Sequence, residues 1–361
     1  MLRPYIERRQ GISEPALQGG NVMRDGLIDL AAARAGGRAL VASDEFFAPK
    51  ENLLKPGRGV FLEGKYTDRG HWMDGWETRR RRGAGYDWCI IRLGIPGVIR
   101  AITVDTNHFR GNHPAECSFD GAELPGASSA RLERDVRRKF AELLPRSPLV
   151  GHTENELAIR SEGRFTHVRL NIYPDGGVAR LRVWGEARPD WRRIAARGRL
   201  IDLAAVQHGG LPVATSDQFF SGPLNLIMPG RPRNMADGWE TRRRRGPGHD
   251  WVVLRLGARG VIERIELDTT YFKGNFPESA GLEGCDAPHL LTGAAPPPDA
   301  AEWRELVPQT KLRPDAPHRF RVANRARLLP ATHVRLNIYP DGGVARLRVW
   351  GRPVDREDSH R

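Results

Sequence analysis

The segment Asp74–Gly83 places carboxylates and guanidinium groups close together on a short stretch of chain. It reads DGWETRRRRG, so that Asp74 and Glu77 precede four consecutive arginines. An arginine fork grips a carboxylate or phosphate through two parallel hydrogen bonds, and a carboxyl group can carry a proton to or from a reacting atom. In an extended chain successive side chains point to opposite faces, so Arg79 and Arg80 diverge. One face can therefore hold an anionic ligand while the other pairs with acids or a neighbouring subunit; a salt-bridged strand edge is the alternative interpretation.

A second segment, Asp105–Pro114, carries polar groups in an arrangement suited to a binding loop. It reads DTNHFRGNHP and follows an apolar stretch, which predicts a loop at the end of a strand, where proteins commonly display binding residues. The groups that could form or orient a site there are Asp105, Thr106, Gly111 and Asn112. Histidine titrates near neutral pH, so His108 is the candidate proton donor or acceptor of this loop. A structural histidine on a surface loop is the simpler alternative.

Both segments occur a second time further along the chain. DGWETRRRRG begins at Asp74 and again at Asp237, and DTNHFRGNHP from Asp105 is answered by DTTYFKGNFP from Asp268. The second copy thus repeats the candidate residues as Asp237, Glu240, Arg242, Arg243, Asp268 and Asn275.

The chain is a tandem duplication. Thr166–Gly185 and Thr332–Gly351 share the same twenty residues, THVRLNIYPDGGVARLRVWG, and SDEFF from Ser43 is matched by SDQFF further on. Ordered repetition of this length does not arise by chance. The offset between the copies changes along the chain, so the first copy carries about ten extra residues between Gly59 and Trp72.

The copies differ at the histidines of the second segment. His108 and His113 of the first copy are replaced by Tyr271 and Phe276 in the second. Tyrosine is a weaker proton donor or acceptor at pH 7, so we expect the first copy to be the catalytic half. The histidines are too few and too loosely spaced to argue for a metal site. The sequence therefore requires no cofactor and leaves a divalent metal open.

Each copy has the length of one domain. The predicted organisation is an N-terminal segment 1–24, a first repeat 25–186, a linker 187–198, a second repeat 199–352 and a C-terminal tail 353–361. The basic stretch that joins the repeats could be a strap or a short helix.

Within each repeat, period-two alternation predicts antiparallel strands. Val168–Tyr173 and Ala179–Trp184 alternate apolar with polar residues, and the Asp-Gly-Gly between them is typical of a hairpin turn. Trp88–Leu93 and Ile99–Asp105 predict two further strands around a turn at Gly94–Gly97. Short strands joined by turns describe an antiparallel sandwich.

Glycine and proline support this all-β interpretation. The 361 residues include 40 glycines and 27 prolines, which favour many turns over long helices. The charged segment Ser128–Leu144 and its counterpart Pro296–Val307 are expected to be loops that lead into strands near Leu143 and Leu306.

Composition excludes several classes of protein. Hydrophobic residues make up 39% and charged residues 28%, as in soluble globular proteins. The three cysteines have no paired spacing, which argues against structural disulfides and a zinc knuckle. The N-terminal residues lack the apolar region of a signal peptide, and no apolar run has membrane-spanning length, so the expected location is the cytoplasm.

The order of the motifs resembles that of the allantoicase family. SDxFF, NLL or NLI, DGWETRRRR, DW, DTxxFxGNxP and VRLNIYPDGGVARLRVWG follow one another twice, from about Asp25 to Gly351. The resemblance implies an all-β fold of two tandem jelly-roll β-sandwiches of the galactose-binding, discoidin-like type. It also implies hydrolysis of allantoate to ureidoglycolate and urea, a step of allantoin degradation in purine catabolism.

The substrate that the resemblance implies sets chemical requirements. Allantoate carries one carboxylate and two ureido groups on one carbon, so its site needs a cation together with neutral donors and acceptors. Releasing urea needs a proton for the departing nitrogen and a base to activate water. We therefore assign His108, Asp105 and Glu77 to proton handling. The expected substrate-binding set comprises Asp74, Trp76, Arg79, Arg80, Thr106, Gly111 and Asn112, with Asp237, Glu240, Arg242, Arg243, Asp268 and Asn275 of the second copy.

Two other functions compete with this hypothesis. A tandem discoidin-like module could bind a sugar or small anion without chemistry, although such modules are usually secreted. The net charge of +13 and the arginine runs could indicate nucleic-acid binding, but acids adjoin each run and aromatic residues are sparse. We expect a small-molecule substrate and a homo-oligomer, with no nucleic-acid or membrane partner.

Overall fold

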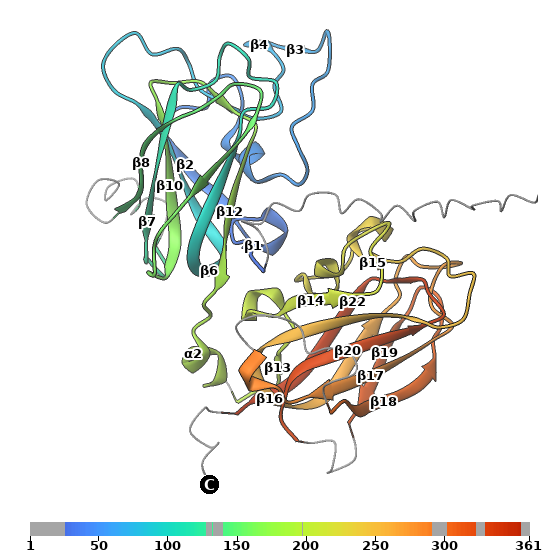
Figure 1. Ribbon diagram of the computed structural model, residues 1–361. Helices are drawn as coiled ribbons and strands as arrows, with labels where there is room; N and C mark the ends of the chain where they lie inside the picture. Colours follow the sequence, from blue (N-terminus) through green and yellow to red (C-terminus); the bar gives the residue numbers. More distant parts are fainter. Residues whose placement is uncertain are drawn as a thin grey trace, which may run out of the picture.

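The structure is a computed structural model that describes residues 26–127, 132, 140–196, 198–290, 302–322 and 329–354. Two β-sandwiches follow one another along the chain (Figure 1). Among the described residues, no helix is long and apolar enough to cross a membrane.

In the first sandwich, one long strand, β6, belongs to both layers. The first half of β6 (Asp87–Asp105) pairs with β2 (Arg38–Ala42) and β10 (Phe165–Tyr173), and its second half pairs with β9 (Glu154–Ala158) and β12 (Arg180–Ala187). The first layer continues through β7 (Glu116–Ala122) and β8 (Ala141–Pro148), and β1 (Ile28–Asp29) forms the edge of the second. All of these pairings are antiparallel.

The second sandwich repeats this topology around β16. Its strands are β13 (Ile201–Asp202), β14 (Leu211–Thr215), β16 (Asp250–Asp268), β17 (Ser279–Cys285), β18 (Arg304–Lys311), β19 (Pro317–Arg321), β20 (Ala331–Tyr339) and β22 (Arg346–Pro353). The prediction of two tandem all-β sandwiches is confirmed, and β8 and β18 begin near the expected Leu143 and Leu306. Most of the loops expected before these strands lie outside the described residues.

Short elements complete each repeat. The two-residue strands are β5 (Trp76–Glu77) with β11 (Gly177–Val178), β15 (Trp239–Glu240) with β21 (Gly343–Val344), and β3 (Tyr66–Thr67) with β4 (Gly70–His71). The 3-10 turns are η2 (Ala33–Ala35), η3 (Lys50–Leu54), η4 (Val206–His208), η5 (Pro223–Ile227), η6 (Met235–Asp237) and η7 (Pro288–Leu290). A short α-helix, α2 (Trp191–Ala195), lies in the segment between the repeats, and its N-cap Asp190 accepts a hydrogen bond from Arg193 N.

Two sequence-based expectations about strand connection were wrong. Trp88–Leu93 and Ile99–Asp105 are halves of β6, not two strands joined by a turn. A Cβ at Gly97 would lie 2.2 Å from the carbonyl oxygen of Glu186, so glycine allows the strands to approach closely where β6 passes from one layer to the other. The glycine and proline residues at 94–97 therefore mark the place where β6 passes from one layer to the other, and they do not form a turn.

The expected hairpin at Asp175–Gly177 is also absent. β10 and β12 lie on opposite sides of β6 in the strand order and do not pair with each other. The alternating pattern identified both strands correctly, but it carries no information about their partners. The Asp-Gly-Gly segment instead connects the two layers and packs on the ring of Phe109.

Gly177 is required by this packing. A Cβ at Gly177 would lie 2.0 Å from the Phe109 ring, and Gly343 stands in the same relation to Phe272 in the second repeat. We expect Gly177→Ala to lower the free energy of unfolding by about 2–3 kcal/mol, because the ring is fully buried and cannot move aside without strain. Chemical denaturation followed by circular dichroism measures the change. Gly111→Ala is the matched control, since its Cβ would meet nothing within 4 Å; equal stability of the two variants would contradict this explanation.

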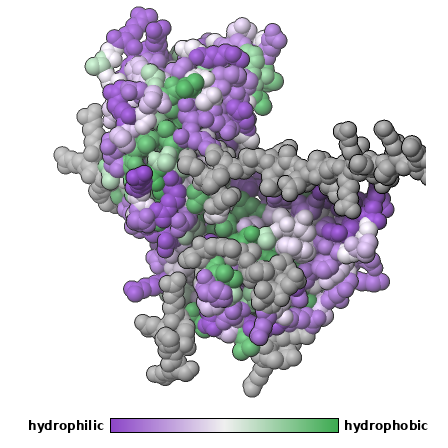
Figure 2. All heavy atoms as spheres, viewed as in Figure 1, coloured by the Kyte–Doolittle hydropathy of each residue, from purple (hydrophilic) through white to green (hydrophobic). Residues whose placement is uncertain are grey.

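The core is continuous through each sandwich. Val168, Leu170 and Ile172 on β10 and Leu181 and Val183 on β12 are fully buried, as the alternating pattern predicted. Between the sandwiches, Arg34 of the first donates a 2.5 Å hydrogen bond to Asn225 of the second. Hydrophilic side chains cover much of the visible face of both sandwiches (Figure 2).

Candidate active site

The two candidate segments of the first repeat meet around Phe109. Its side chain is fully buried, and Gly177 N donates to Asn112 O at 2.8 Å while Thr78 N donates to Gly176 O at 3.2 Å. The loop after β6, the strand β5 and the connection between the layers therefore form one assembly. Equivalent bonds join Gly343 to Asn275 and Thr241 to Gly342 in the second repeat.

Glu77 and Asn112, both predicted from the sequence, are in direct contact. Asn112 Nδ2 donates to Glu77 Oε1 at 2.8 Å, and Asn275 donates to Glu240 at 2.5 Å in the second repeat. Burial raises the pKa of Glu77, and the hydrogen bond from Asn112 only partly offsets it. A carboxyl group with a raised pKa holds its proton closer to neutral pH, as a general acid requires.

The arginines of the first repeat show the alternation expected of an extended chain. Arg79 pairs with Asp44 at 2.7 Å and lies over the ring of Phe46, whereas Arg81 pairs with Asp87 at 2.6 Å. Within the described part of the chain, the exposed Arg80 forms no ion pair. Arg80 is therefore the better candidate for holding an anion, and Arg79 is committed to the protein.

The second repeat divides its arginines in the same way. Arg242 pairs with Asp217 at 3.0 Å and Arg244 pairs with Asp250 at 2.5 Å. Arg243 is exposed and, among the described residues, forms no ion pair. In each repeat an exposed arginine thus lies between two anchored ones. The last arginine of each run, Arg82 or Arg245, is also exposed and forms no ion pair among the described residues.

Asp74 and Asp237 anchor the loops that flank the site. Asp74 pairs with Arg180 at 2.5 Å and accepts a hydrogen bond from Val60 N. Burial alone raises the pKa of Asp74, but the hydrogen bonds from Arg180 and Val60 outweigh it and bring the pKa below its ordinary value. Asp237 pairs with Arg346 at 2.9 Å, and its pKa is lowered in the same way. Both carboxylates are committed to internal ion pairs.

Two residues predicted as substrate contacts have no surface for a ligand. Trp76 is fully buried, and its indole Nε1 donates to the carbonyl oxygen of Asp44 at 2.8 Å. Thr106 is also fully buried, and its hydroxyl donates to Val150 O and Thr153 O. We therefore assign both to loop packing. The position of Gly111 is open, since a Cβ there would meet no atom within 4 Å.

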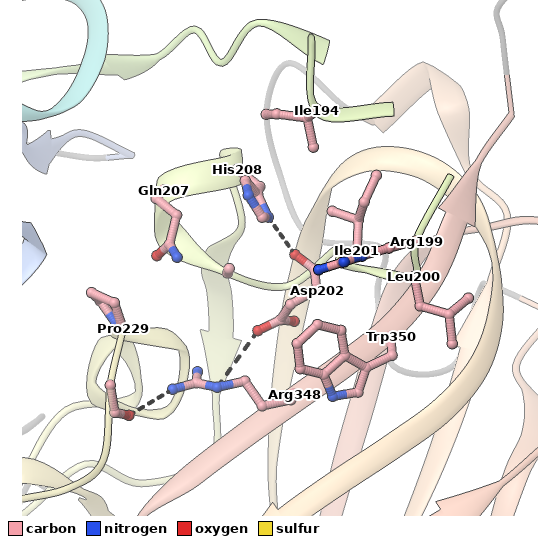
Figure 3. Close-up of a pocket in the computed structure, with 12 residues that line it drawn as sticks. Ile194, Arg199, Leu200, Ile201, Asp202, Gln207, His208, Pro229, Arg348 and Trp350 are labelled. Atoms are coloured by element: carbon pink, nitrogen blue, oxygen red, sulfur yellow. Dashed lines mark hydrogen bonds and ion pairs between the residues drawn. The ribbon is translucent and has the colours of Figure 1, made fainter. Parts of the chain in front are cut away.

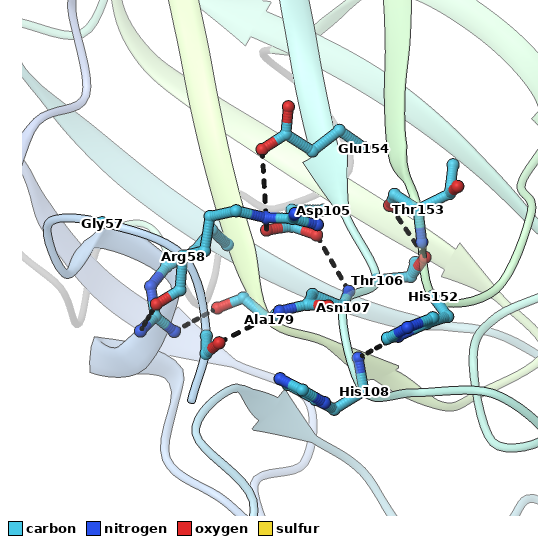
Figure 4. Close-up of polar contacts among 12 residues, drawn as sticks. Gly57, Arg58, Asp105, Thr106, Asn107, His108, His152, Thr153, Glu154 and Ala179 are labelled. Atoms are coloured by element: carbon cyan, nitrogen blue, oxygen red, sulfur yellow. Dashed lines mark hydrogen bonds and ion pairs between the residues drawn. The ribbon is translucent and has the colours of Figure 1, made fainter. Parts of the chain in front are cut away.

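Asp105 lies in a polar cluster with three residues that were not predicted (Figure 4). Its Oδ1 accepts a hydrogen bond from Asn107 N at 2.8 Å, and Arg58 Nε lies 3.7 Å from its other oxygen and 3.3 Å from Glu154. Asp105 is only 3% exposed, which places it behind Arg58. Direct proton handling by Asp105 is therefore disfavoured, and positioning of Arg58 is the role that its contacts support.

His108 is paired with a second histidine that the sequence analysis missed. The backbone N–H of His108 donates to His152 Nδ1 at 3.0 Å, and the two rings lie 5.5 Å apart (Figure 4). Phe61, from the extra segment of the first repeat, stacks on the ring of His108 with the ring centroids 5.5 Å apart. Burial, assisted by the charge of Arg110, lowers the pKa of His152. A neutral His152 can accept the backbone hydrogen bond.

The second repeat keeps the backbone geometry but changes the chemistry. His108 and Tyr271 both adopt left-handed backbone conformations, with φ of 68° and 73°, and Tyr271 N donates to Asp315. Asp268 accepts a hydrogen bond from Thr270 N there. Asp315 replaces His152, and the position of Glu154 is taken by a proline. Comparing the repeats beyond the obvious motifs could have revealed this pair of differences.

The described residues contain no group of three or more His, Cys, Asp or Glu side chains able to hold a metal ion. The contacts instead define two clusters in the first repeat. Glu77 and Asn112 form one, just before the arginine run in the chain, and Arg58, Asp105, His108 and His152 form the other, on loops that share Phe109.

The fold and these clusters define a tandem-repeat β-sandwich protein with a candidate hydrolytic site in its loops. The allantoicase repeat model matches residues 28–188 and 201–354. The chain belongs to the allantoicase family, and the expected fold of two tandem all-β sandwiches agrees with that of a solved allantoicase.

Several known proteins are similar over nearly the whole chain. "Probable allantoicase 1" of Burkholderia mallei is 47% identical, with 90% of this chain and 94% of the relative covered. "Probable allantoicase" of Ralstonia nicotianae is 47% identical with the same coverage. The crystal structure of allantoicase from Saccharomyces cerevisiae is 36% identical, has a TM-score of 0.75 and covers 90% of this chain and 93% of its own.

Proposed function

We propose that this chain hydrolyses allantoate to ureidoglycolate and urea in allantoin degradation. The observation that carries the proposal is the family match over both repeats, together with 47% identity to relatives across 90% of the chain. In the reaction, the bond between the central carbon and one ureido nitrogen breaks. Water supplies the hydroxyl that remains on this carbon, and the departing nitrogen gains a proton to give urea. Ureidoglycolate is the other product.

The first repeat contains groups suited to each requirement of this reaction. Arg80 is exposed and forms no ion pair with the described residues. It holds the carboxylate of allantoate. Glu77, whose pKa is raised by burial, donates the proton to the departing nitrogen, and Asn112 fixes its orientation. His108 accepts a proton from the attacking water, and His152 holds the backbone of its loop in place.

Urea release from allantoate tests the proposal. Purified chain, shown to be folded by circular dichroism, is incubated with allantoate at neutral pH, with a chelator and with added divalent cations in separate arms. We expect urea and ureidoglycolate to accumulate in equal amounts, with none formed from the cyclic precursor allantoin. Absence of urea in every arm would overturn the proposal, and saturable allantoate binding without turnover would favour the non-catalytic module.

The remaining properties follow from the same hypothesis. We propose a cytoplasmic homo-oligomer that does not bind nucleic acid. Exposed Phe219 and Phe220, each 62% accessible, support contact with another subunit. The pairing of Arg79 and Arg242 with acids supports a structural rather than a phosphate-binding role for much of the arginine runs.

A further inference from the structure

The extra segment of the first repeat, residues 60–72, contains the hairpin of β3 and β4 (Figure 1). Its first residue is bound to one candidate segment, because Val60 N donates to Asp74 Oδ2 at 3.2 Å. The residue before it is bound to the other, because Asn107 Nδ2 donates to the carbonyl oxygen of Gly59 at 3.0 Å. The extra segment therefore starts between the two loops that carry the candidate residues.

Aromatic rings connect this segment to His108. The ring centroids of Phe61 and His108 lie 5.5 Å apart, with an angle of 30° between the ring planes. Phe61 also stacks on His71, with the centroids 5.0 Å apart and the planes nearly parallel. Tyr66 meets His71 in an edge contact at 4.8 Å. Rings at such separations attract one another, so an array of contacts joins the hairpin to the loop of His108.

Ring contacts, and not hydrogen bonds, restrict the side chain of His108. Its backbone is held by the hydrogen bond from N to His152 Nδ1 at 3.0 Å. Within the part of the chain that the structure describes, neither ring nitrogen of His108 forms a hydrogen bond. A proton acceptor needs an available nitrogen and a well-oriented ring. Stacking on Phe61 restricts the orientation of the ring and leaves both nitrogens available.

The second repeat has no equivalent array. Among the described residues, Tyr271, which replaces His108, makes no ring contact, and it is 41% exposed. A pocket of about 390 Å³ in this repeat is lined by residues of the linker, η4 and β22, such as His208 and Arg348 (Figure 3). Its lining includes no residue from the loop of Tyr271. Within the described residues, the array is therefore specific to the first repeat.

Two residues that contact the extra segment also differ between the repeats. Asn107, which donates to the start of the segment, is replaced by Thr270, whose hydroxyl donates to Asp268 Oδ1 at 2.6 Å. His108, which contacts a ring of the segment, is replaced by Tyr271. The extra segment and the polar residues that bind it thus occur in the same repeat, as expected for parts of one site.

We propose that Phe61 is a positioning residue for the hydrolysis of allantoate. The inference rests on the proposed function, in which His108 accepts a proton from the attacking water. Phe61 acts through His108 by fixing the orientation of the imidazole ring, and His71 supports Phe61 from within the extra segment. Phe61 itself does not bind the substrate. The extra segment is therefore a working part of the catalytic half.

Nuclear magnetic resonance of the full chain with isotope-labelled histidine tests the ring contact without substrate. Alkaline pH keeps histidine titration out of the comparison. In Phe61→Leu the ring signals of His108, assigned by their loss in His108→Asn, are expected to move to lower field, because a stacked ring shields nearby protons. Leu62→Ala is the control, since Leu62 is 45% exposed and Phe61 46%; it should leave these signals in place. Unchanged His108 signals in folded Phe61→Leu would overturn the proposal.

Steady-state urea release from allantoate tests the consequence for the reaction. Phe61→Leu is expected to lower kcat about tenfold and leave KM unchanged, because the proton acceptor is less well oriented. Phe61→Tyr keeps a ring at this position, so its kcat should stay within about 2-fold of the unmodified chain. Leu62→Ala should also retain full activity. Thermal melting checks that each variant is folded.

The possible outcomes separate this inference from the proposed function. An unchanged kcat in folded Phe61→Leu, or an equal loss in Phe61→Tyr, would overturn the positioning role. A raised KM with unchanged kcat would contradict it as well, because Phe61 would then contact the substrate. If the unmodified chain releases no urea, the proposed function fails, whereas the histidine spectra still decide whether Phe61 fixes the ring of His108.

Discussion

Glu77→Gln is expected to lower the rate of urea release from allantoate by about 1000-fold, within the range for loss of a general acid. Glutamine has nearly the same shape and still accepts the hydrogen bond from Asn112, so the loop keeps its contact. What disappears is the carboxyl group that would donate the proton, whose pKa burial raises. The kcat from a continuous urea assay measures the effect, and KM is expected to change little.

Glu240→Gln is the matched control for this experiment. Its carboxylate makes the same contact with Asn275 in the second repeat, but no histidine pair accompanies it there. We expect kcat within a factor of about 3 of the unmodified chain. Equal losses in the two variants would show that both repeats catalyse. Full activity of Glu77→Gln would remove Glu77 from the mechanism.

The pH profile gives an independent check on Glu77. A general acid works in its protonated form, so activity falls as pH rises through the pKa of the group. Because burial raises the pKa of Glu77, this fall begins at a higher pH than for an ordinary glutamate. In Glu77→Gln that limb of the profile should vanish from the residual activity.

His108→Asn is expected to lower kcat by about 100-fold, while Tyr271→Asn changes it by less than about 3-fold. Asparagine tolerates the left-handed conformation that both residues adopt, so neither substitution strains its loop. The side chain removed from the first repeat contacts the rings of Phe61 and His152, and the second repeat has Asp315 in place of His152. Steady-state assays with thermal melts separate catalysis from folding. Equal effects would mean that the difference between the repeats is sequence drift.

The sequence predicted what depends on local pattern. Period-two alternation identified β10 and β12, and the repeated motifs identified the duplication and the family. In an extended chain the side chains of Arg79 and Arg80 point in opposite directions. The ion pair between Arg79 and Asp44 agrees with this expectation. The contact between Glu77 and Asn112 joins two segments that were both selected for their chemistry.

What the sequence did not reveal depends on tertiary contact. Alternation cannot tell which strand lies beside β10, so the connection between layers was mistaken for a hairpin. Trp76 and Thr106 lie within the candidate segments and have side chains that often bind ligands. Both are fully buried, so they serve in packing. Arg58 and His152 come from outside the recognised motifs, and only the folded chain places them beside Asp105 and His108.

The long strand shared by both layers has a consequence for how each repeat loses its structure. In a sandwich of two separate sheets, one sheet can open while the other persists. Here the 19 residues of β6 supply backbone hydrogen bonds to both, so detaching either sheet disrupts the ladder of the other. Each repeat should therefore behave as one cooperative unit in native-state hydrogen exchange, with amides at both ends of β6 opening in the same event.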